Sequence, residues 1–303
     1  MTPAAPRPVL IDTDGGLDDA LALHCLARCP DIRLVAVGAV HGNVTADAAA
    51  RNALRALELA GDRSTPVAVG AAEPLAQPLR LRHPDDPFAA LAGPPGRETS
   101  GQNAVEQLLG LARARPGELE LLTLGPLTNL ATALSAEPRL PRLLRRVVSM
   151  AGALDTTGNI TAAAETNVHL DPDAAEHVLS AGFALTLVSL DVTRTVTAGR
   201  AWLQQLADHA APPWGPAAAM LAQAGDQVPS LPLHDPLAAA VLVDEHLVLE
   251  RRDAPVAVVL DDRHGHRGAT RIATDDPARP PVAITGAVDP EAVLARLASA
   301  LTA

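Results

Sequence analysis

Short apolar strands alternate with alanine-rich helical stretches along most of the chain, and this alternation constrains the fold more than any other feature. The first strand is predicted at 8–12 and the first helix at 18–29, followed by a strand at 33–40 and a helix at 46–60. Further strands are predicted at 66–70, 118–124, 147–152, 184–190, 256–260 and 281–288. Near-continuous apolar strands separated by helices are typical of a buried parallel sheet. The pattern predicts an α/β fold with a mostly parallel central sheet flanked by helices.

The length of 303 residues is compatible with one large α/β domain. We find no internal repeat and no linker-like composition, so we predict a single domain over residues 1–303. Two segments, 71–101 and 205–235, lack regular periodicity. Long irregular segments in compact domains are usually functional, so these two are candidate lids.

The composition excludes several classes of function. The formal charge of −11 disfavours nucleic acid and anionic membrane surfaces as partners. All 24 basic residues are arginine, which excludes a Schiff-base lysine and the phosphate-binding lysine of P-loop proteins. The chain has no tyrosine, and its aromatic residues are Phe88, Phe183, Trp202 and Trp214. A ligand is therefore expected to find few rings on which to stack.

Features that report on cellular location indicate the cytoplasm. Cys25 and Cys29 are too few for a disulfide framework, and we interpret them as reduced core thiols rather than as half of a zinc site. No apolar segment precedes the first charged residues, so no signal peptide is expected. No apolar run reaches the roughly 18 residues of a membrane span, so we expect no membrane association.

Four carboxylates fall within eight residues, at the carboxyl end of the first predicted strand and the start of the first helix: Asp12, Asp14, Asp18 and Asp19. Asp18 and Asp19 have an ordinary explanation, because acidic residues often cap the start of a helix. Asp12 and Asp14 need another explanation, because both are acidic and lie close together. Like charges about 4 Å apart repel by roughly 1 kcal/mol in water and up to about 4 kcal/mol near a protein surface. Protons or a hard cation such as Ca²⁺ or Mg²⁺ must relieve this repulsion. The cluster therefore indicates an all-oxygen cation site.

Other residues that suit a ligand site follow later strands. Asn43 and Asn159 come after predicted strands, as Asp14 does, and Leu124 is the last residue of another. In open α/β sheets, ligands bind at the edge where the carboxyl ends of the strands meet. Carboxylates and amides there, with no cationic group nearby, suit a neutral polyol bound to a cation better than a phosphate. We therefore expect a sugar site at this edge.

The same residues resemble a known family. Residues 11–23, IDTDGGLDDALAL, are similar to the amino-terminal signature of the nucleoside hydrolases, with Gly15 where proline is common. Further similar segments follow in the family's order at 40–43 (VHGN), 124–129 (LGPLTN), 158–172 (with GN, AETN and DP) and 234–236 (HDP). The resemblance covers about residues 9–240. It implies a calcium-dependent, nucleoside-hydrolase-like catalytic domain over 1–303, with its active site at the carboxyl ends of the strands.

The resemblance also implies a Ca²⁺ cofactor and a mechanism. Asp14, Asp19 and Asp235 would bind the cation through their side chains, and Leu124 would bind it through its carbonyl oxygen. Asp14 would also take a proton from the attacking water, and the transition state would resemble an oxocarbenium ion. The reaction would split the N-glycosidic bond of a ribonucleoside into free base and ribose.

Further roles fall on the substrate. His234 would protonate the departing base, and Asp12 would orient the cation ligands from behind. Taken alone, the asparagines equally suit turns, and His234 suits a helix start. The side chains around the ribose would be Asp18, Asn43, Asn159, Glu165, Asn167 and Asp235.

Two departures from the family pattern fall on the side of the base. His83 lies where many members carry an HGxxG segment, and Thr166 replaces a bulkier residue. Three questions stay open: purine or pyrimidine preference, closure of segment 83–101, and the leaving-group acid, which is His234, His83 or neither. Relatives form dimers or tetramers, so the resemblance implies a homo-oligomer that acts in purine or pyrimidine salvage.

Two alternatives compete with a ribonucleoside hydrolase, and a third possibility keeps the chemistry but changes the sugar or the leaving group. A non-catalytic, calcium-dependent nucleoside-binding relative is compatible with the missing glycines and the few aromatic residues. The segment IDTDGG also resembles the start of haloacid-dehalogenase-type phosphatases, with Asp12 as nucleophile and Asp14 as acid. That mechanism needs a later lysine, and the chain has none.

Overall fold

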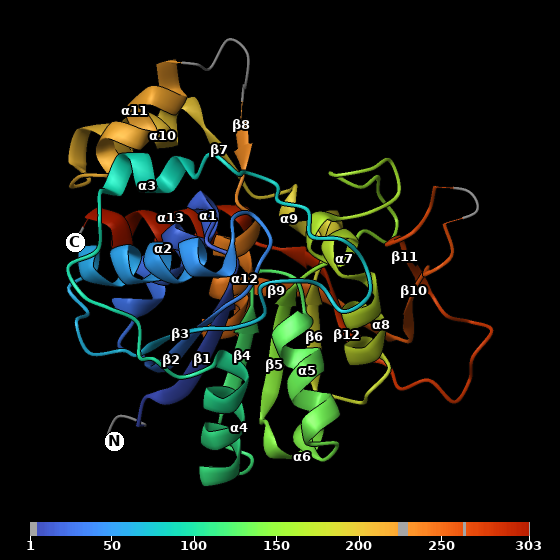
Figure 1. Ribbon diagram of the computed structural model, residues 1–303. Helices are drawn as coiled ribbons and strands as arrows, with labels where there is room; N and C mark the ends of the chain where they lie inside the picture. The colour runs from blue at the N-terminus through green and yellow to red at the C-terminus, as the bar shows by residue number, and fades with distance from the viewer. Residues whose placement is uncertain (1–4, 224–229, 263–264, 303) are drawn as a thin grey trace.

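A sheet of eight strands forms the centre of the computed structural model, which describes residues 5–223, 230–262 and 265–302 (Figure 1). Neighbouring strands are parallel throughout, except that the last strand of the order below runs antiparallel to its neighbour. In spatial order the strands are β3 (Val67–Val69), β2 (Ile32–Ala39), β1 (Arg7–Thr13), β4 (Glu120–Thr123), β5 (Arg146–Met150), β6 (Leu185–Val188), β12 (Val282–Val288) and β9 (Val248–Ala254). The predicted mostly parallel sheet is confirmed.

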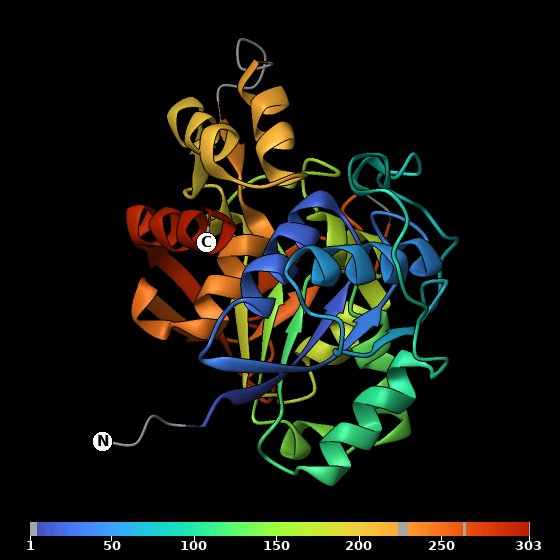
Figure 2. The ribbon, with the colours of Figure 1, turned by 90° about the vertical axis from the view of Figure 1, so that its left-hand side faces the viewer.

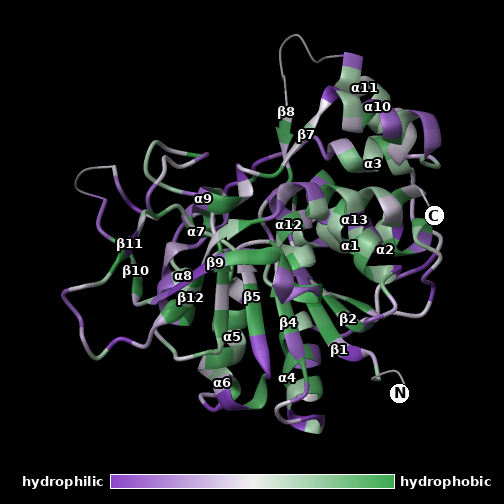
Figure 3. Cartoon of the chain, turned by 180° about the vertical axis from the view of Figure 1, so that it is seen from behind, coloured by the Kyte–Doolittle hydropathy of each residue, from purple (hydrophilic) through white to green (hydrophobic). Residues whose placement is uncertain are grey.

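Helices cover both faces of this sheet, because successive strand residues point to opposite sides. In β1, Val9 and Ile11 join one buried apolar cluster, whereas Leu10 joins the other. Figure 3 shows β1, β2, β4 and β5 as largely hydrophobic, as expected for strands buried on both faces. The first face carries α1 (Leu17–Ala27), α2 (Ala46–Leu59), α12 (His234–Val243) and α13 (Pro290–Thr302). The second face carries α4 (Ala104–Ala114), α5 (Thr128–Ala136), α6 (Leu140–Leu143) and α8 (Pro172–Leu179).

A smaller group of elements lies beyond the carboxyl edge of the sheet (Figures 1 and 2). It consists of α3 (Pro87–Ala92), α10 (Arg200–His209), α11 (Trp214–Gln223) and the antiparallel pair β7 (Thr197–Gly199) and β8 (Ser230–Pro232). We call these elements the lid group. They come from the two segments predicted as candidate lids, 71–101 and 205–235, and from residues just before the second. Part of the second segment, 224–229, lies outside the described residues.

The remaining elements are short. Two of them, α7 (Thr166–Leu170) and α9 (Leu190–Thr193), follow β5 and β6, and a 3-10 turn (Glu245–Leu247) precedes β9. The predicted strand at 256–260 is shorter and lies outside the main sheet, where β10 (Val256–Val258) pairs with β11 (Thr270–Ile272). The sequence reading missed β9, because its charged residues lack the apolar pattern of the buried strands.

The carboxyl end of α12 is clamped to the sheet by an ionic cluster. Glu120, which is fully buried in β4, forms salt bridges with Arg7 at 2.7 Å and with Arg146 at 3.0 Å. Both arginines also donate to the carbonyl of Leu242 in the last turn of α12. A cation there satisfies carbonyls that have no partner within the helix. The cluster therefore holds one end of a buried helix whose other end reaches the carboxyl edge.

Candidate active site

The turn after β1 brings carboxylates to the carboxyl edge of the sheet. Gly15 has a φ of +77°, and a Cβ atom there would lie 2.5 Å from the Cα of Ala49, so only glycine fits this tight turn. Asp19, at the start of α1, accepts hydrogen bonds from the Thr13 hydroxyl at 2.5 Å and from the Gly16 amide at 3.0 Å. Asp19 thus caps the helix, as the ordinary explanation holds, and also belongs to the acidic cluster.

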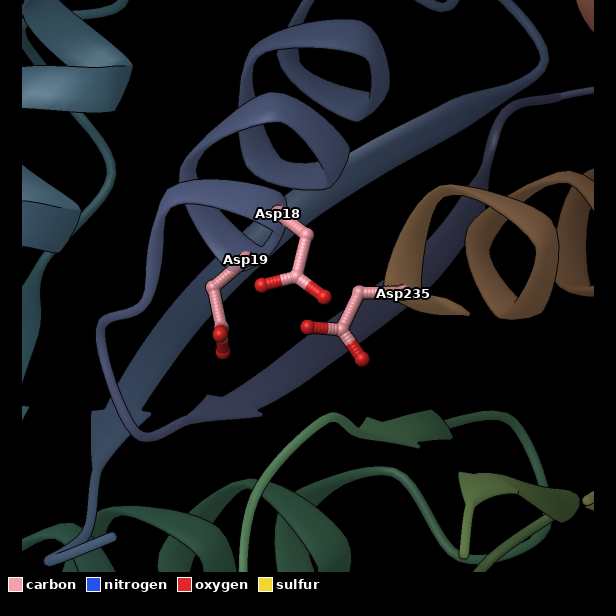
Figure 4. Close-up of side chains that lie close together, drawn as sticks. All are labelled: Asp18, Asp19 and Asp235. Carbon is pink, nitrogen blue, oxygen red and sulfur yellow. The ribbon is translucent and has the colours of Figure 1, made fainter. Parts of the chain in front are cut away.

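Asp18, Asp19 and Asp235 point toward one another, although Asp235 lies more than 200 positions after the other two (Figure 4). Each offers an oxygen atom, and these atoms all lie within 4.8 Å of one another. Asp14 lies outside this group of three and faces Asn43, whose backbone amide and side-chain amide both donate to it at 2.8 Å. The structure therefore groups Asp18 with two predicted cation ligands. We call the four carboxylates Asp14, Asp18, Asp19 and Asp235 the acidic cluster.

The electrostatics of the acidic cluster favour a bound cation. Burial raises the pKa of Asp14 and Asp235 well above the ordinary value, and neighbouring carboxylates raise both further. Burial and the nearby charge of Asp18 also raise the pKa of Asp19. In the described part of the chain, no arginine forms a salt bridge with the acidic cluster. Oxygen donors that repel one another and have no cationic partner fit a hard divalent cation.

A cavity of about 370 Å³ opens above the acidic cluster. Asp14 and Asp19 lie beneath it, fully buried. Eight of the ten predicted site residues line the cavity: Asp18, Asn43, Leu124, Asn159, Glu165, Asn167, His234 and Asp235. The structure thus gathers the predicted positions around one cavity.

Hydrogen bonds within the protein fix the amide and carboxylate groups of this cavity. The side-chain amide of Asn167 donates to the carbonyls of Leu124 and Met150, both at 2.9 Å. Glu165 accepts backbone N–H groups at the start of α7, including that of Asn167 at 2.8 Å. Asn159 accepts from the backbone amide of Thr166 at 2.9 Å. These contacts hold each side chain in one orientation before any ligand binds.

Hydrogen bonds position two further residues that the sequence singled out, Asp12 and His234. Asp12 is buried and accepts a hydrogen bond from the Asn129 side chain at 2.8 Å, and burial raises its pKa to about 7. His234 starts α12, and its Nδ1 lies 2.7 Å from the Thr193 hydroxyl. Burial lowers the pKa of His234, and the nearby charge of Asp18 opposes this shift. The contact with Thr193 leaves Nε2 of His234 for a ligand.

Segment 71–101 contributes to the cavity. His83 and Arg82 both line it. The backbone amide of His83 donates to the carbonyl of Asn43 at 2.7 Å, and the Arg82 guanidinium donates to the carbonyl of Asn159 at 3.4 Å. The expectation that no cationic group lies near the site was therefore wrong. Sequence reasoning missed Arg82 because this segment has no regular periodicity from which to place it.

The aromatic rings at the cavity are few, as the composition predicted. The chain has only two tryptophans, and both Trp202 and Trp214 line the cavity from the lid group. The rings are few, but they are concentrated at one place. Their position inside or beside a segment predicted as a lid was a signal that the sequence reading did not use.

Comparisons with known proteins agree on one family. The sequence profile described as inosine-uridine preferring nucleoside hydrolase matches residues 9–295. Probable uridine nucleosidase 2 of Oryza sativa subsp. japonica is 36% identical over 200 residues, which is 64% of this chain and 59% of the relative. The pyrimidine-specific ribonucleoside hydrolase RihA of Citrobacter koseri is 38% identical over 190 residues, or 61% of each chain. These alignments thus span about 60% of the length of the curated relatives.

Solved structures match over nearly the whole chain. A plant nucleoside hydrolase, the PpNRh1 enzyme, has a TM-score of 0.90 at 29% identity and covers 98% of this chain and 99% of its own. An inosine-guanosine nucleoside hydrolase has a TM-score of 0.86 at 27% identity and covers 98% of both chains. The family match over residues 9–295 argues against the alternative of a haloacid-dehalogenase-type phosphatase. The chain belongs to the inosine-uridine preferring nucleoside hydrolase family.

Proposed function

We propose that this protein hydrolyses the N-glycosidic bond of ribonucleosides to free base and ribose. One observation carries the proposal: carboxylates and oriented amides from distant parts of the chain meet at a single cavity whose opposite side is apolar. The polar side suits a ribose with several hydroxyl groups, and the apolar side suits a base. Family membership and the names of the relatives support the same reaction.

The cation is proposed to be Ca²⁺, held by Asp14, Asp19, Asp235 and the carbonyl of Leu124. Asn167 already donates to that carbonyl, which keeps its second lone pair for the cation. When bound, Ca²⁺ would bind ribose hydroxyls and lower the pKa of a neighbouring water. All four groups are oxygen donors, as a hard cation requires.

Asp14 is the proposed base that removes a proton from the water attacking C1′ of the ribose. Its two oxygens are held by the two N–H donors of Asn43, so the carboxylate has one orientation. Asp18, Asn43, Asn167 and Asp235 would hold the 2′ and 3′ hydroxyls. The negative charge of the acidic cluster would stabilise the positive charge that develops on the ribose in an oxocarbenium-like transition state.

The remaining roles concern the 5′ end and the departing base. Asn159 and Glu165 would hold the 5′ hydroxyl from the loop before α7. His234 would donate a proton to the base through Nε2, since its Nδ1 lies against Thr193. His234 is the first residue of α12 and Asp235 is the second, so the helix fixes the distance between the proposed acid and this proposed cation ligand.

We also propose how the chain works as a whole. Residues 1–303 would act as one catalytic domain, because α1, near the start of the chain, and α12, in its last third, line the same cavity. The protein would work in the cytoplasm as a dimer or tetramer that salvages purine or pyrimidine nucleosides. In the described residues, no helix is long and apolar enough to cross a membrane.

The test is the release of reducing sugar from inosine, uridine, adenosine and cytidine in phosphate-free buffer. Each nucleoside is assayed with Ca²⁺, after chelation, and after Ca²⁺ is restored. Ribose that appears with Ca²⁺ and disappears on chelation would support the hydrolase. If no nucleoside is cleaved while Ca²⁺ still raises the melting temperature, the protein is a non-catalytic nucleoside-binding relative.

A further inference from the structure

The short helix α9 contacts two parts of the candidate active site: the loop that leads to Asn159 and the histidine at the start of α12. Its polar side chains are Asp191 and Thr193, and Arg194 follows directly. None of these three residues lines the cavity, and the proposed function gives none of them a role. They can therefore act on a reaction only through the groups that do line the cavity.

Asp191 and Arg194 fasten α9 to the loop over residues 154–158. The Asp191 carboxylate accepts hydrogen bonds from two consecutive backbone amides of this loop, at 3.0 and 2.7 Å. The Arg194 guanidinium donates to two carbonyls of the same loop, at 2.7 and 2.9 Å. The helix and the loop are thus held together as one unit directly before Asn159.

Thr193 connects this unit to His234. The Thr193 side chain is fully buried, and its hydroxyl oxygen lies 2.7 Å from Nδ1 of His234. Among the described residues, this is the one hydrogen bond that the hydroxyl makes. A buried hydroxyl needs an acceptor for its hydrogen, so Thr193 donates to Nδ1. A neutral His234 ring then carries its own hydrogen on Nε2.

The direction of the ring decides what His234 offers to a ligand. His234 lines the cavity, whereas Thr193 lies behind it. With Nδ1 turned toward Thr193, Nε2 is the nitrogen that can reach a ligand, and the hydrogen bond at one ring nitrogen determines which nitrogen is protonated. A hydroxyl can also accept, so the same contact holds the ring when Nδ1 carries a hydrogen as well.

Building on the proposed function, in which His234 protonates the departing base, we infer that Thr193 is a positioning residue for this acid. Its hydroxyl fixes the imidazole so that Nε2, with its hydrogen, faces the base. Asp191 and Arg194 keep that hydroxyl in place through the loop before Asn159. One short helix therefore sets the positions of the proposed acid and of the proposed contact with the 5′ hydroxyl.

The kinetic test compares two substrates that need the acid to different degrees. One is the nucleoside that the wild type cleaves fastest among inosine, uridine, adenosine and cytidine. The other is p-nitrophenyl riboside, whose leaving group needs no proton. Thr193→Val keeps the shape of the side chain and removes the hydroxyl. Its kcat for the nucleoside should fall roughly tenfold or more, a part of what a general acid contributes, with KM little changed. Its kcat for p-nitrophenyl riboside should be almost unaltered, which also shows that the variant is folded.

Two further variants complete this arm. Thr193→Ser restores the hydroxyl and should retain most of the activity on both substrates. The matched control is Thr195→Val, the same change at an exposed position whose hydroxyl donates to the carbonyl of Val192 at 2.7 Å, and it should leave both kcat values unchanged. Equal losses on the two substrates in Thr193→Val, no loss on either, or a Thr193→Ser variant as slow as Thr193→Val would overturn the inference.

The state of the ring can also be measured without catalysis. Nitrogen NMR of the imidazoles is recorded on the Ca²⁺-loaded protein at mildly alkaline pH, where His234 is neutral because burial lowers its pKa. Signals are assigned by their loss in His234→Gln. In the wild type, Nε2 should carry the hydrogen and Nδ1 should be an acceptor. Thr193→Val should shift the Nδ1 signal, whereas Thr193→Ser should leave it nearly in place.

The two arms separate this inference from the hydrolase proposal. A protein that cleaves no nucleoside but shows these NMR changes would refute the hydrolase and still support the orientation of His234 by Thr193. Cleavage of nucleosides by a wild type whose His234 carries its hydrogen on Nδ1 would overturn the inference alone.

Discussion

The two sides of the cavity are built in different ways. The polar side comes from the loops that follow β1, β2, β4 and β5 and from the first turns of α1, α7 and α12, and backbone groups hold several of its side chains in place. The opposite side, which we call the apolar wall, comes mainly from the lid group, which lies outside the main sheet and is held by side-chain packing. Its main side chains are Leu21, Trp202, Leu203, Leu206, Trp214 and Leu231. The comparison shows that the polar groups are positioned by the sheet and its loops, whereas the apolar side depends on packing between elements that are distant in the sequence.

The largest effect is expected on the polar side. Asp14→Ala should abolish ribose release, a loss of at least about 10³-fold, because it removes the proposed base and a proposed cation ligand together. Base binding measured by tryptophan fluorescence should remain, since Asp14 does not line the apolar wall.

Asp14→Asn is the matched variant, because an amide keeps the shape of the carboxylate. Burial and repulsion within the acidic cluster raise the pKa of Asp14. Without Ca²⁺, the melting temperature of Asp14→Asn should therefore equal or exceed that of the wild type. Hydrolysis retained by either variant would remove Asp14 from the role of base.

His234→Ala should have an intermediate effect, because His234 lies where the two sides meet. General acid catalysis contributes roughly 10² to 10⁴-fold, so kcat for inosine should fall by about this factor. p-Nitrophenyl riboside, whose leaving group needs no proton, should be cleaved almost as fast as by the wild type. Equal losses on both substrates would exclude the acid role, and His83→Ala serves as the parallel variant of the other cavity histidine.

The smallest effect is expected where the lid group meets α1. His24→Gln should lower the free energy of unfolding at pH 7 by about 1 kcal/mol, the typical contribution of one hydrogen bond, here the one from Trp214. Burial lowers the pKa of His24 to about 4, whereas the unfolded chain takes up this proton near pH 6.5. The wild type therefore loses stability as the pH falls from 6.5 toward 4, and glutamine removes this loss.

The stability difference between wild type and His24→Gln should accordingly shrink between about pH 7 and pH 5, as measured by urea unfolding. The exposed His209→Gln is the control for a histidine outside the contact. A difference that stays constant with pH would show that protonation of His24 is not linked to folding.

The polar side could be predicted from sequence, whereas the apolar wall could not. Asp14, Asn43, Leu124 and Asn159 follow strands that apolar runs reveal, and parallel strands bring such positions to one edge. The contact between Trp214 and His24 joins residues 190 positions apart, and no local pattern encodes it. Strand β9 was missed for a related reason, since an exposed edge strand carries charged residues instead of an apolar run.

The clamp on α12 has a consequence for the order of folding. Asp19 and Asp235 lie 216 positions apart in the sequence, and they meet only when α12 has docked with its carboxyl end against Glu120 and the two arginines. Closing a contact between such distant residues costs chain entropy, so we expect this contact to form late in folding. Interactions absent from the folding transition state change the unfolding rate and leave the folding rate nearly unaltered. A cation bound at this site would therefore slow unfolding while leaving the folding rate nearly unchanged.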